Sequence, residues 1–288
     1  MLLTARAPAM SFLPFYAAEE EGFFEKEGVR VRLLHVRAPK SRIVQLVVEG
    51  EIDFYTSIST TVQSILQGWG EVRALCATSA SIHPCAARVE IKTLADLRGK
   101  KVMSGGGRSR NEILWLCHRY GWNPHTDIEI VPGELADRVK AFSDPSFAAV
   151  FGRAEYLFWI KKGGFHLLDY PDLERGWPGA GLATSVNLIR KDPDSVQRVV
   201  NGVVASTEFL KTHRDEAVAI AKRHITHLDQ EAIEANFDLM RPWYTCEISS
   251  GAIKHQAEVL GIARGEYRPL EVEDIADLSF LRRATKRE

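Results

Sequence analysis

The chain has 288 residues, of which 45% are hydrophobic and 26% are charged. This length suits two α/β lobes or one large domain, and the composition excludes an intrinsically disordered chain. Lys plus Arg (37) nearly balance Asp plus Glu (38). The short basic stretches at 30–42 and 282–287 lack interleaved aromatic residues, so we expect no nucleic-acid partner. No segment approaches the roughly 20 apolar residues of a membrane span, so we expect no direct membrane insertion.

The first part of the chain alternates short β-rich runs with helical periodicity, which is typical of parallel sheets covered by helices. Ser11 is the expected N-cap of the first helix, because a serine oxygen can accept hydrogen bonds from the free amides of a first turn. Gly22, Gly50 and Gly68 follow expected helices as stop signals. In chain order we expect strand 2–5, helix 12–21, strand 29–33, helix 41–49, strand 52–56, helix 60–66 and strand 72–78.

The same alternation resumes after the segment 84–89. A loop rich in glycine and proline is expected at 169–181, and the Asp192-Pro193 pair predicts a capped helix start. From there the chain reads as largely helical to its end. The expected elements of this part are strand 101–103, helix 111–120, strand 128–131, helix 135–142, strand 147–151, helix 154–162, strand 165–168 and strand 182–189.

The reactive residue types form no recognisable catalytic or metal-binding motif. The four cysteines, Cys76, Cys85, Cys117 and Cys246, include no Cys-x-x-Cys pair and have no zinc-site spacing with histidine. We expect buried thiols, with a Cys76 to Cys85 bridge left open as an alternative. Since His-Glu-x-x-His and Gly-x-Ser-x-Gly are also absent, no catalytic residue, metal site or cofactor is predicted.

One glycine-rich turn is the strongest candidate for ligand binding. It lies after an expected strand and before an expected helix, where free amides and the positive end of the helix dipole favour an anion. Its glycines would allow close backbone approach, and Arg108 offers a bidentate fork for a carboxylate or sulfonate. A plain flexible turn is the alternative. The candidate residues are Ser104, Gly105, Gly106, Gly107, Arg108 and Ser109.

Two further turns carry polar or aromatic side chains at corresponding places. Hydroxyl residues gather at 56–61, and Ser57, Ser59 and Thr60 could hydrogen-bond the oxygens of a ligand, although capping alone would use one or two of them. Ser11 and Phe12 could supply a hydroxyl and an aromatic face near the amino terminus, although such aromatic residues are more often part of the core.

Several motifs resemble the NMT1/THI5-like branch of solute-binding proteins. Gly22-Phe23-Phe24 and Val29-Arg30-Val31 are similar to the opening of that family, and 49–54 is similar to its Gly-x-x-Asp-hydrophobic strand. The most specific match is 93–102, which resembles the pattern x-Leu-x-Asp-Leu-x-Gly-Lys-x-Val. The resemblance continues through 182–185 and 192–194, so that about residues 1–240 fit.

This resemblance implies an α/β, two-lobed type II periplasmic-binding-protein fold. Each lobe would be a mostly parallel sheet flanked by helices, with 1–86 and 184–288 forming a discontinuous first lobe, 87–183 forming the second, and a two-segment hinge between them. The implied function is capture of a small anionic or polar ligand, such as a sulfonate, carboxylate or pyrimidine-like compound, between the lobes. An ABC permease would be the partner of an exported protein. Relatives also place cleft residues near Arg153 and Glu155.

The alternative function is that of a cytosolic enzyme on the same scaffold, such as an aromatic-acid decarboxylase or lyase. The family is normally exported, and Met1–Met10 lacks a secretory leader pattern. We therefore expect a periplasmic protein if a leader precedes this sequence and a cytoplasmic one if it does not. A yeast-type pyrimidine synthase is disfavoured, because His83-Pro84-Cys85 does not reproduce its cysteine-rich iron motif.

If Arg108 holds the anion, Arg108→Ala should weaken ligand binding by roughly 1.5–3 kcal/mol, the range for a hydrogen bond to a charged group. Titration calorimetry of both proteins measures the difference. An unchanged affinity would remove Arg108 from the site.

Overall fold

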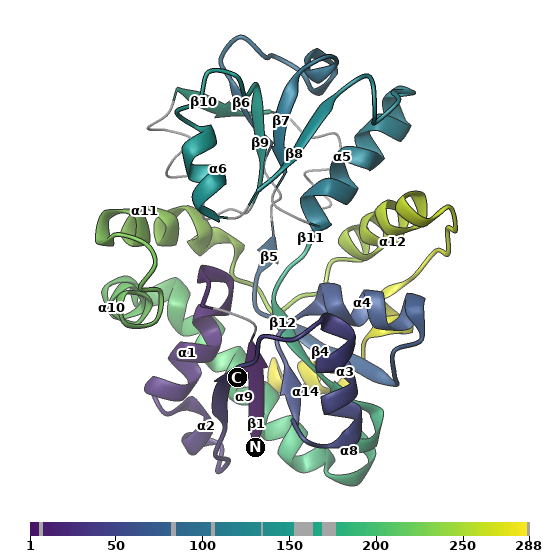
Figure 1. Cartoon of the computed structure of the whole chain (residues 1–288). Helices are drawn as coiled ribbons and strands as arrows, with labels where there is room; N and C mark the ends of the chain where they lie inside the picture. The colour runs from purple at the N-terminus through teal and green to yellow at the C-terminus, as the bar shows by residue number, and fades with distance from the viewer. Residues whose placement is uncertain are drawn as a thin grey trace. The chain divides into compact units, whose positions relative to one another are not determined.

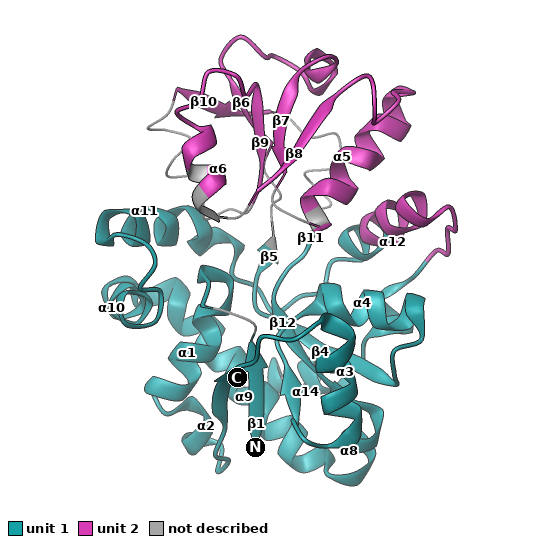
Figure 2. Ribbon diagram, viewed as in Figure 1, with its two compact units in different colours: residues 1–81, 177–254, 270–288 teal, residues 82–176, 255–269 magenta. Residues whose placement is uncertain are grey.

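The computed structural model describes residues 1–5, 8–81, 85–104, 107–133, 135–152, 164–168 and 177–286. The chain forms two compact units. Unit 1 comprises Met1–Ser81, Trp177–Lys254 and Leu270–Glu288, and unit 2 comprises Ile82–Gly176 and His255–Pro269 (Figure 2). Compared with the predicted lobes, the second unit also includes 82–86 and 255–269, and the first unit also includes 177–183. The predicted lobe boundaries stay a prediction.

Unit 1 is built on a five-stranded sheet with the order β2-β1-β3-β12-β4 (Figure 1). Strand β12 is antiparallel to both of its neighbours, whereas β1 is parallel to β2 and β3. A short antiparallel pair, β5 with β11, lies outside this sheet. The strands of unit 1 are β1 (Leu2–Ala5), β2 (Arg32–His35), β3 (Phe54–Tyr55), β4 (Val72–Ala77), β5 (Ala80–Ser81), β11 (Trp177–Pro178) and β12 (Gly181–Ser185).

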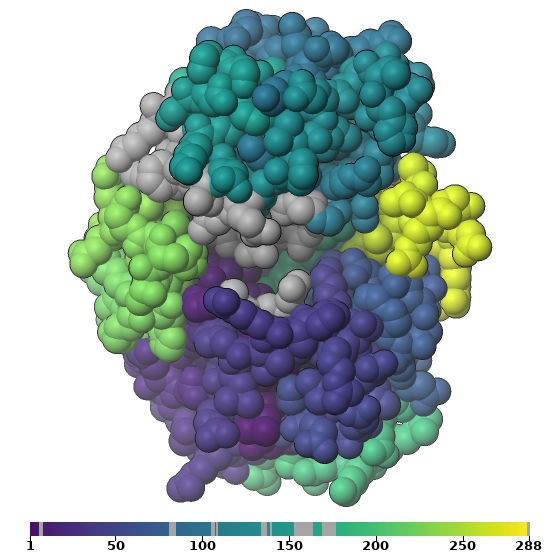
Figure 3. All heavy atoms as spheres, viewed as in Figure 1, coloured from purple at the N-terminus to yellow at the C-terminus, as the bar shows by residue number. Residues whose placement is uncertain are grey.

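Helices cover both faces of this sheet. On one face, apolar residues of α1, α2, α9 and α14 join the strands in a single core that includes Phe15, Val199 and Phe280. On the other face α3 and α4 pack against β3, β4 and β12, and their outer sides form the blue-violet surface over unit 1 in Figure 3. The helices of unit 1 are η1 (Met10–Phe12), α1 (Leu13–Glu20), α2 (Phe23–Lys26), α3 (Lys40–Glu49), α4 (Ile58–Gln67), α8 (Val186–Lys191), α9 (Pro193–Thr212), α10 (Arg214–His224), α11 (Gln230–Met240), η5 (Arg241–Trp243), α13 (Val272–Ile275) and α14 (Ser279–Ala284).

Unit 2 repeats this plan with the sheet order β10-β6-β9-β7-β8. Strand β6 is antiparallel to β9 and β10, and β7 is parallel to β8 and β9. Helix α12 (Ser250–Arg264) lies in unit 1 up to Lys254 and in unit 2 from His255 onward. The other elements of unit 2 are β6 (Cys85–Arg88), η2 (Leu94–Leu97), β7 (Lys101–Ser104), α5 (Gly107–Tyr120), β8 (Glu129–Pro132), α6 (Leu135–Ala141), β9 (Ala149–Phe151) and β10 (Phe165–Leu167).

The predicted alternation of strands and helices is confirmed, and several local predictions are wrong. Ser11 does not cap the first helix: the Phe12 amide donates to the Ala9 carbonyl at 3.0 Å, which makes a 3₁₀ turn, and α1 begins after it. The strand expected at 182–189 ends at Ser185, whose hydroxyl accepts from the Leu188 amide at 3.2 Å and so caps α8. Helix α2 and strand β6 are not among the elements expected from the sequence.

Other predicted signals are confirmed by the backbone. Gly50 and Gly68 adopt left-handed conformations at the ends of α3 and α4, which a residue without a Cβ does at little cost. Asp192 accepts from the Ser195 amide at 3.1 Å and Pro193 opens α9. The predicted helix 154–162 lies outside the described residues. Within the described part of the chain, no helix is long and apolar enough to cross a bilayer.

An ionic cluster attaches α1 to α10 in unit 1. Glu20 bonds the Arg223 guanidinium and lies 2.6 Å from Nε2 of His224. The His224 ring also stacks on Tyr16, with ring centroids 4.1 Å apart. Burial alone would raise the pKa of Glu20, but the hydrogen bonds from Arg223 and His224 outweigh it and lower the pKa below its usual 4.5.

This lowered pKa predicts a pH-dependent contribution to stability. A carboxylate with a depressed pKa in the folded state stabilises the fold above its unfolded pKa, and the stabilisation is lost as the pH falls through the folded pKa. Glu20→Gln should therefore lower the melting temperature at pH 7 by about 2–4 °C, which corresponds to about 1 kcal/mol. The difference should be constant well above pH 4.5 and should decrease as the pH falls through the lowered pKa of Glu20.

Thermal unfolding at several pH values measures this difference. Glu216→Gln is the control, because Glu216 is exposed on α10 and has no side-chain partner among the described residues. A difference for Glu20→Gln that stays constant from pH 7 to pH 3 would contradict the assignment.

Candidate functional site

The turn before α4 is a compact hydroxyl cluster at the carboxyl end of β3. Ser57 caps α4, because its Oγ accepts from the Thr60 amide at 3.1 Å and from the Thr60 hydroxyl at 2.9 Å. Thr61 Oγ1 lies 2.8 Å from the Tyr55 hydroxyl and donates to the Ser57 carbonyl at 3.2 Å. The helix start is thus fixed by a network of short-range bonds, which holds its first amides in one orientation.

The predicted residues of this turn differ in accessibility. Ser59 and Thr60 are buried, whereas Ser57 is partly exposed. The hydroxyls of Ser57 and Thr60 both take part in the cap. A ligand would therefore have to share these groups with the cap, and their role in binding stays a prediction.

The predicted pair near the amino terminus lies in η1. Ser11 and Phe12 are both partly buried, and Phe12 packs against the core of unit 1. The same turn is held by Tyr244, whose hydroxyl donates a hydrogen bond to the Met10 carbonyl at 2.9 Å. Phe12 therefore has a structural role in addition to any contact with a ligand.

The glycine-rich turn of unit 2 is shorter than predicted. Helix α5 begins at Gly107, four residues before the predicted start, so Gly107, Arg108 and Ser109 belong to its first turn. Ser104 ends β7 in the buried interior, Ser109 is also buried, and Gly107 is exposed. Gly105, Gly106, Arg153 and Glu155 lie outside the described residues, as does the side chain of Arg108.

Glu112 is a buried acid that the sequence analysis missed. It lies one turn after Ser109 on α5 and is 1% exposed. It interacts electrostatically with Cys85 on β6. The pKa of the Cys85 thiol is raised mainly by burial and to a smaller extent by the nearby Glu112 carboxylate. The sequence Arg110-Asn111-Glu112 reads as a solvated face. The spacing of three from Ser109 is the signal that could have placed Glu112 on the inner face of the helix.

Two of the motifs that carry the family resemblance have structural roles. Asp53 ties β3 to β1, because its Oδ2 accepts from the Leu2 amide at 2.6 Å. Thr93 and Asp96 form a capping box at η2, in which Asp96 Oδ2 accepts from the Lys92 and Thr93 amides at 2.9 Å each. These motifs therefore stabilise the local fold.

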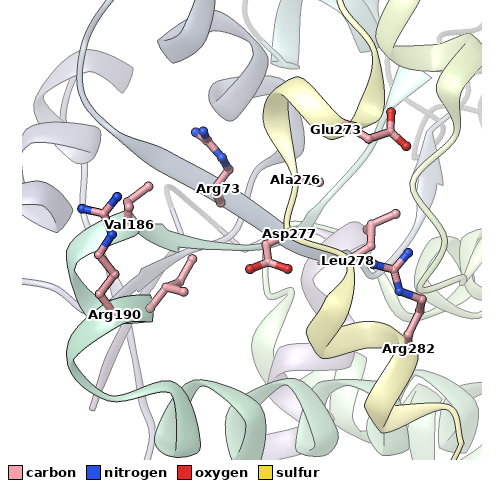
Figure 4. A pocket seen from close by; sticks show the side chains of 9 residues that line it. Arg73, Val186, Arg190, Glu273, Ala276, Asp277, Leu278 and Arg282 are labelled. Atoms are coloured by element: carbon pink, nitrogen blue, oxygen red, sulfur yellow. The ribbon is translucent and has the colours of Figure 1, made fainter.

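A surface cavity of about 400 Å³ lies in unit 1, at the amino end of β4. Figure 4 shows Arg73 from β4, Arg190 from α8 and Arg282 from α14 around Asp277. Asp277 is already bonded, since its Oδ1 accepts from the Ser279 amide at 3.0 Å. The cavity is bordered by acids as well as arginines, and it contains none of the predicted site residues. It is lined by Arg73, Val186, Ile189, Arg190, Glu273, Ala276, Asp277, Leu278 and Arg282.

In the part of the chain that the structure describes, no three His, Cys, Asp or Glu residues gather as a metal site would require. The candidate groups of unit 1 are the hydroxyls and helix amides at the start of α4, and those of unit 2 are the amides at the start of α5 and the buried Glu112 carboxylate. Such groups suit hydrogen bonding to oxygen-rich ligands.

Solved structures share this fold over nearly the whole chain. The periplasmic aliphatic sulphonate binding protein SsuA from Escherichia coli is 16% identical with a TM-score of 0.75, over 96% of this chain and 91% of SsuA. The desulfurization enzyme DSZB is 16% identical with a TM-score of 0.67, over 99% of each chain. The fold is thus the predicted α/β fold of two-lobed type II periplasmic binding proteins.

The chain belongs to the NMT1/THI5-like family, whose sequence profile matches residues 9–217. A further relative is YtlA of Bacillus subtilis (strain 168), named as a candidate binding protein. It is 21% identical over 238 residues, which cover 79% of this chain and 71% of YtlA. The resemblance inferred from the sequence motifs is confirmed.

The four thiols are buried and free, as predicted, and the structure contains no Cys76 to Cys85 bridge. Burial raises the pKa of Cys76 and Cys85, and it raises the pKa of Cys117 and Cys246 to about 11. At pH 8 a thiol of pKa 11 is about 0.1% thiolate, the form that reacts with disulfide reagents.

The native protein at pH 8 should therefore react with less than one equivalent of a disulfide reagent over an hour, and the unfolded protein with four. Absorbance of the released thiolate measures both. A thiol that reacts within minutes in the native protein would contradict the buried assignment.

Proposed function

We propose that the protein is the solute-binding component of an ABC-type importer, which captures a small anionic or polar organic molecule. Membership of the NMT1/THI5-like family supports this proposal. SsuA, which has the same fold, is named as an aliphatic sulphonate binding protein. At 16% identity the similarity to SsuA supports a shared fold and not a shared ligand. We therefore infer the ligand class from the chemistry of the site.

The observation that carries the proposal is that each unit has a strand-to-helix junction at one of the predicted turns. Strand β3 ends at Tyr55 and α4 begins at Ile58, whereas β7 ends at Ser104 and α5 begins at Gly107. First-turn amides and the helix dipole attract the oxygens of an anion. We propose that both helix starts contribute to binding, with Arg108 as the cation from unit 2 and Ser57 as a hydroxyl from unit 1.

The ligand class that fits this chemistry is a sulfonate, a carboxylate or a pyrimidine-like compound. Each offers several hydrogen-bond acceptors to hydroxyls and amides. As an importer component, the protein would act in the periplasm and deliver its ligand to a membrane permease. This partner and this location follow from the proposed function.

A thermal-shift screen with ethanesulfonate, taurine, nitrate, benzoate and a hydroxymethylpyrimidine tests the proposal. A ligand at 100 times its Kd stabilises the folded state by about 2.7 kcal/mol. At least one compound should therefore raise the melting temperature by about 5–10 °C. Arg108→Ala should reduce that shift.

The same fold serves the enzyme DSZB, so each mixture should also be analysed for products after the scan. Conversion of a compound by catalytic amounts of protein would replace the transport proposal with an enzymatic one. The absence of both binding and turnover across the panel would reject the proposed ligand class.

A further inference from the structure

Unit 1 contains buried polar side chains that differ in whether they have a bonding partner. Thr184 Oγ1 donates to the Asp53 carbonyl at 2.6 Å. The amide of Asn201 accepts from Gln197 at 2.8 Å and donates to Glu27 at 2.7 Å. Among the described residues of unit 1, Thr78, Ser79 and Asn236 are buried and their side-chain polar atoms have no partner.

Thr78 and Ser79 directly follow β4, at its carboxyl end. The backbone amides of Thr78 and Ser79 donate hydrogen bonds to the Ala180 carbonyl at 3.0 Å and 3.5 Å, and these bonds hold the backbone in place. Their side chains are 0% and 1% exposed, and neither hydroxyl is used by that arrangement. Buried hydroxyls normally find a partner, because losing hydration without replacement costs free energy.

Asn236 lies on the buried face of α11 and is 0% exposed. Both its amide nitrogen and its amide oxygen lack a partner. A carboxamide donates through nitrogen and accepts through oxygen, so it is satisfied only by a group that both accepts and donates. An apolar residue would fill this position at lower cost unless the amide has another use.

The segment 244–246 brings these residues to one region of unit 1. The Cys246 carbonyl accepts from the amide of Ala77, the residue before Thr78, at 2.9 Å. Tyr244 bonds the Met10 carbonyl of η1 and packs on Phe237, the residue after Asn236, with ring centroids 6.2 Å apart. Helix α11 also packs against η1. The segment 244–246 thus contacts β4 just before Thr78, α11 at the residue after Asn236, and η1, which carries Ser11.

The charge of this region limits what it can recognise. The described residues of unit 1 include no Asp, Glu, Lys or Arg among their buried polar side chains. Hydroxyls and a carboxamide bind oxygens without a counter-charge, and the unused Asn236 oxygen additionally requires a donor. The complementary ligand therefore has acceptor oxygens and also a hydroxyl or amine.

We propose that Thr78, Ser79 and Asn236 form a ligand subsite that binds the acceptor oxygens and the hydroxyl or amino group of a hydroxy- or amino-substituted acid. The inference rests on the proposed solute-binding function and names the ligand class of that site. In the absence of ligand these three residues destabilise the protein, and the ligand supplies their missing hydrogen bonds.

The first test needs no ligand and compares matched variants. Thr78→Val and Asn236→Leu remove unpartnered polar groups and should each raise the melting temperature of the ligand-free protein by about 2–4 °C. The controls Thr184→Val and Asn201→Leu remove bonded groups of the same types and should lower it by a similar amount. Destabilisation of Thr78→Val and Asn236→Leu equal to that of their controls would overturn the inference.

The second test compares acids that differ in one donor. Isethionate should bind at least about tenfold more tightly than ethanesulfonate, or lactate more tightly than propionate, as measured by calorimetry. Asn236→Leu should abolish this preference, and Thr78→Val should weaken binding at least about fivefold. Equal affinities within both pairs, or an unchanged preference in Asn236→Leu, would overturn the inference.

The two proposals fail in different ways. If none of the acids binds while Thr78→Val and Asn236→Leu are stabilised, the proposed ligand class is rejected together with the subsite, and only the lack of internal partners for these polar groups is confirmed. If an acid binds and both variants bind it as the native protein does, the function stands and the subsite is wrong.

Discussion

The organisation of unit 1 depends on one constraint: a polar group withdrawn from water needs a hydrogen-bond partner. Most of its buried hydroxyls meet this requirement within the protein, as Thr61 does with Tyr55 and Thr184 does with the Asp53 carbonyl. These bonds fix the start of α4 and the pairing of β12 with its neighbours. At the end of β4 and on α11 the requirement is unmet, and there the fold retains groups that increase the free energy of the ligand-free state. We interpret them as part of the binding function.

Much of the fold could be predicted from the sequence. The alternation of β-rich runs and helical periodicity located most strands and helices of both sheets, because that pattern reflects burial on two sides. Short elements escaped it: the four residues of α2 are too few for a period, and β6 begins beside a proline. The first helix start was misplaced because Ser11 offers a cap whereas the 3₁₀ turn through Phe12 uses backbone bonds alone.

The candidate site was less accessible to sequence reasoning than the fold. Turns rich in serine and glycine after strands are visible in the sequence, and Ser57 is indeed a helix cap. Glu112 and Asn236 are polar residues on the inner faces of helices, and a single sequence reads them as surface. Whether a buried threonine is bonded depends on tertiary neighbours far away in the chain, as the 131-residue separation between Thr184 and Asp53 illustrates.

The central claim is that this fold holds one small polar acid without covalent chemistry. Native mass spectrometry of the purified protein, with and without added acids, tests it most directly. Non-covalent binding of one acid should give a single additional mass under native conditions that disappears on denaturation. A protein that shows its bare mass in the presence of millimolar amounts of every acid, or that retains an added mass after denaturation, would contradict it.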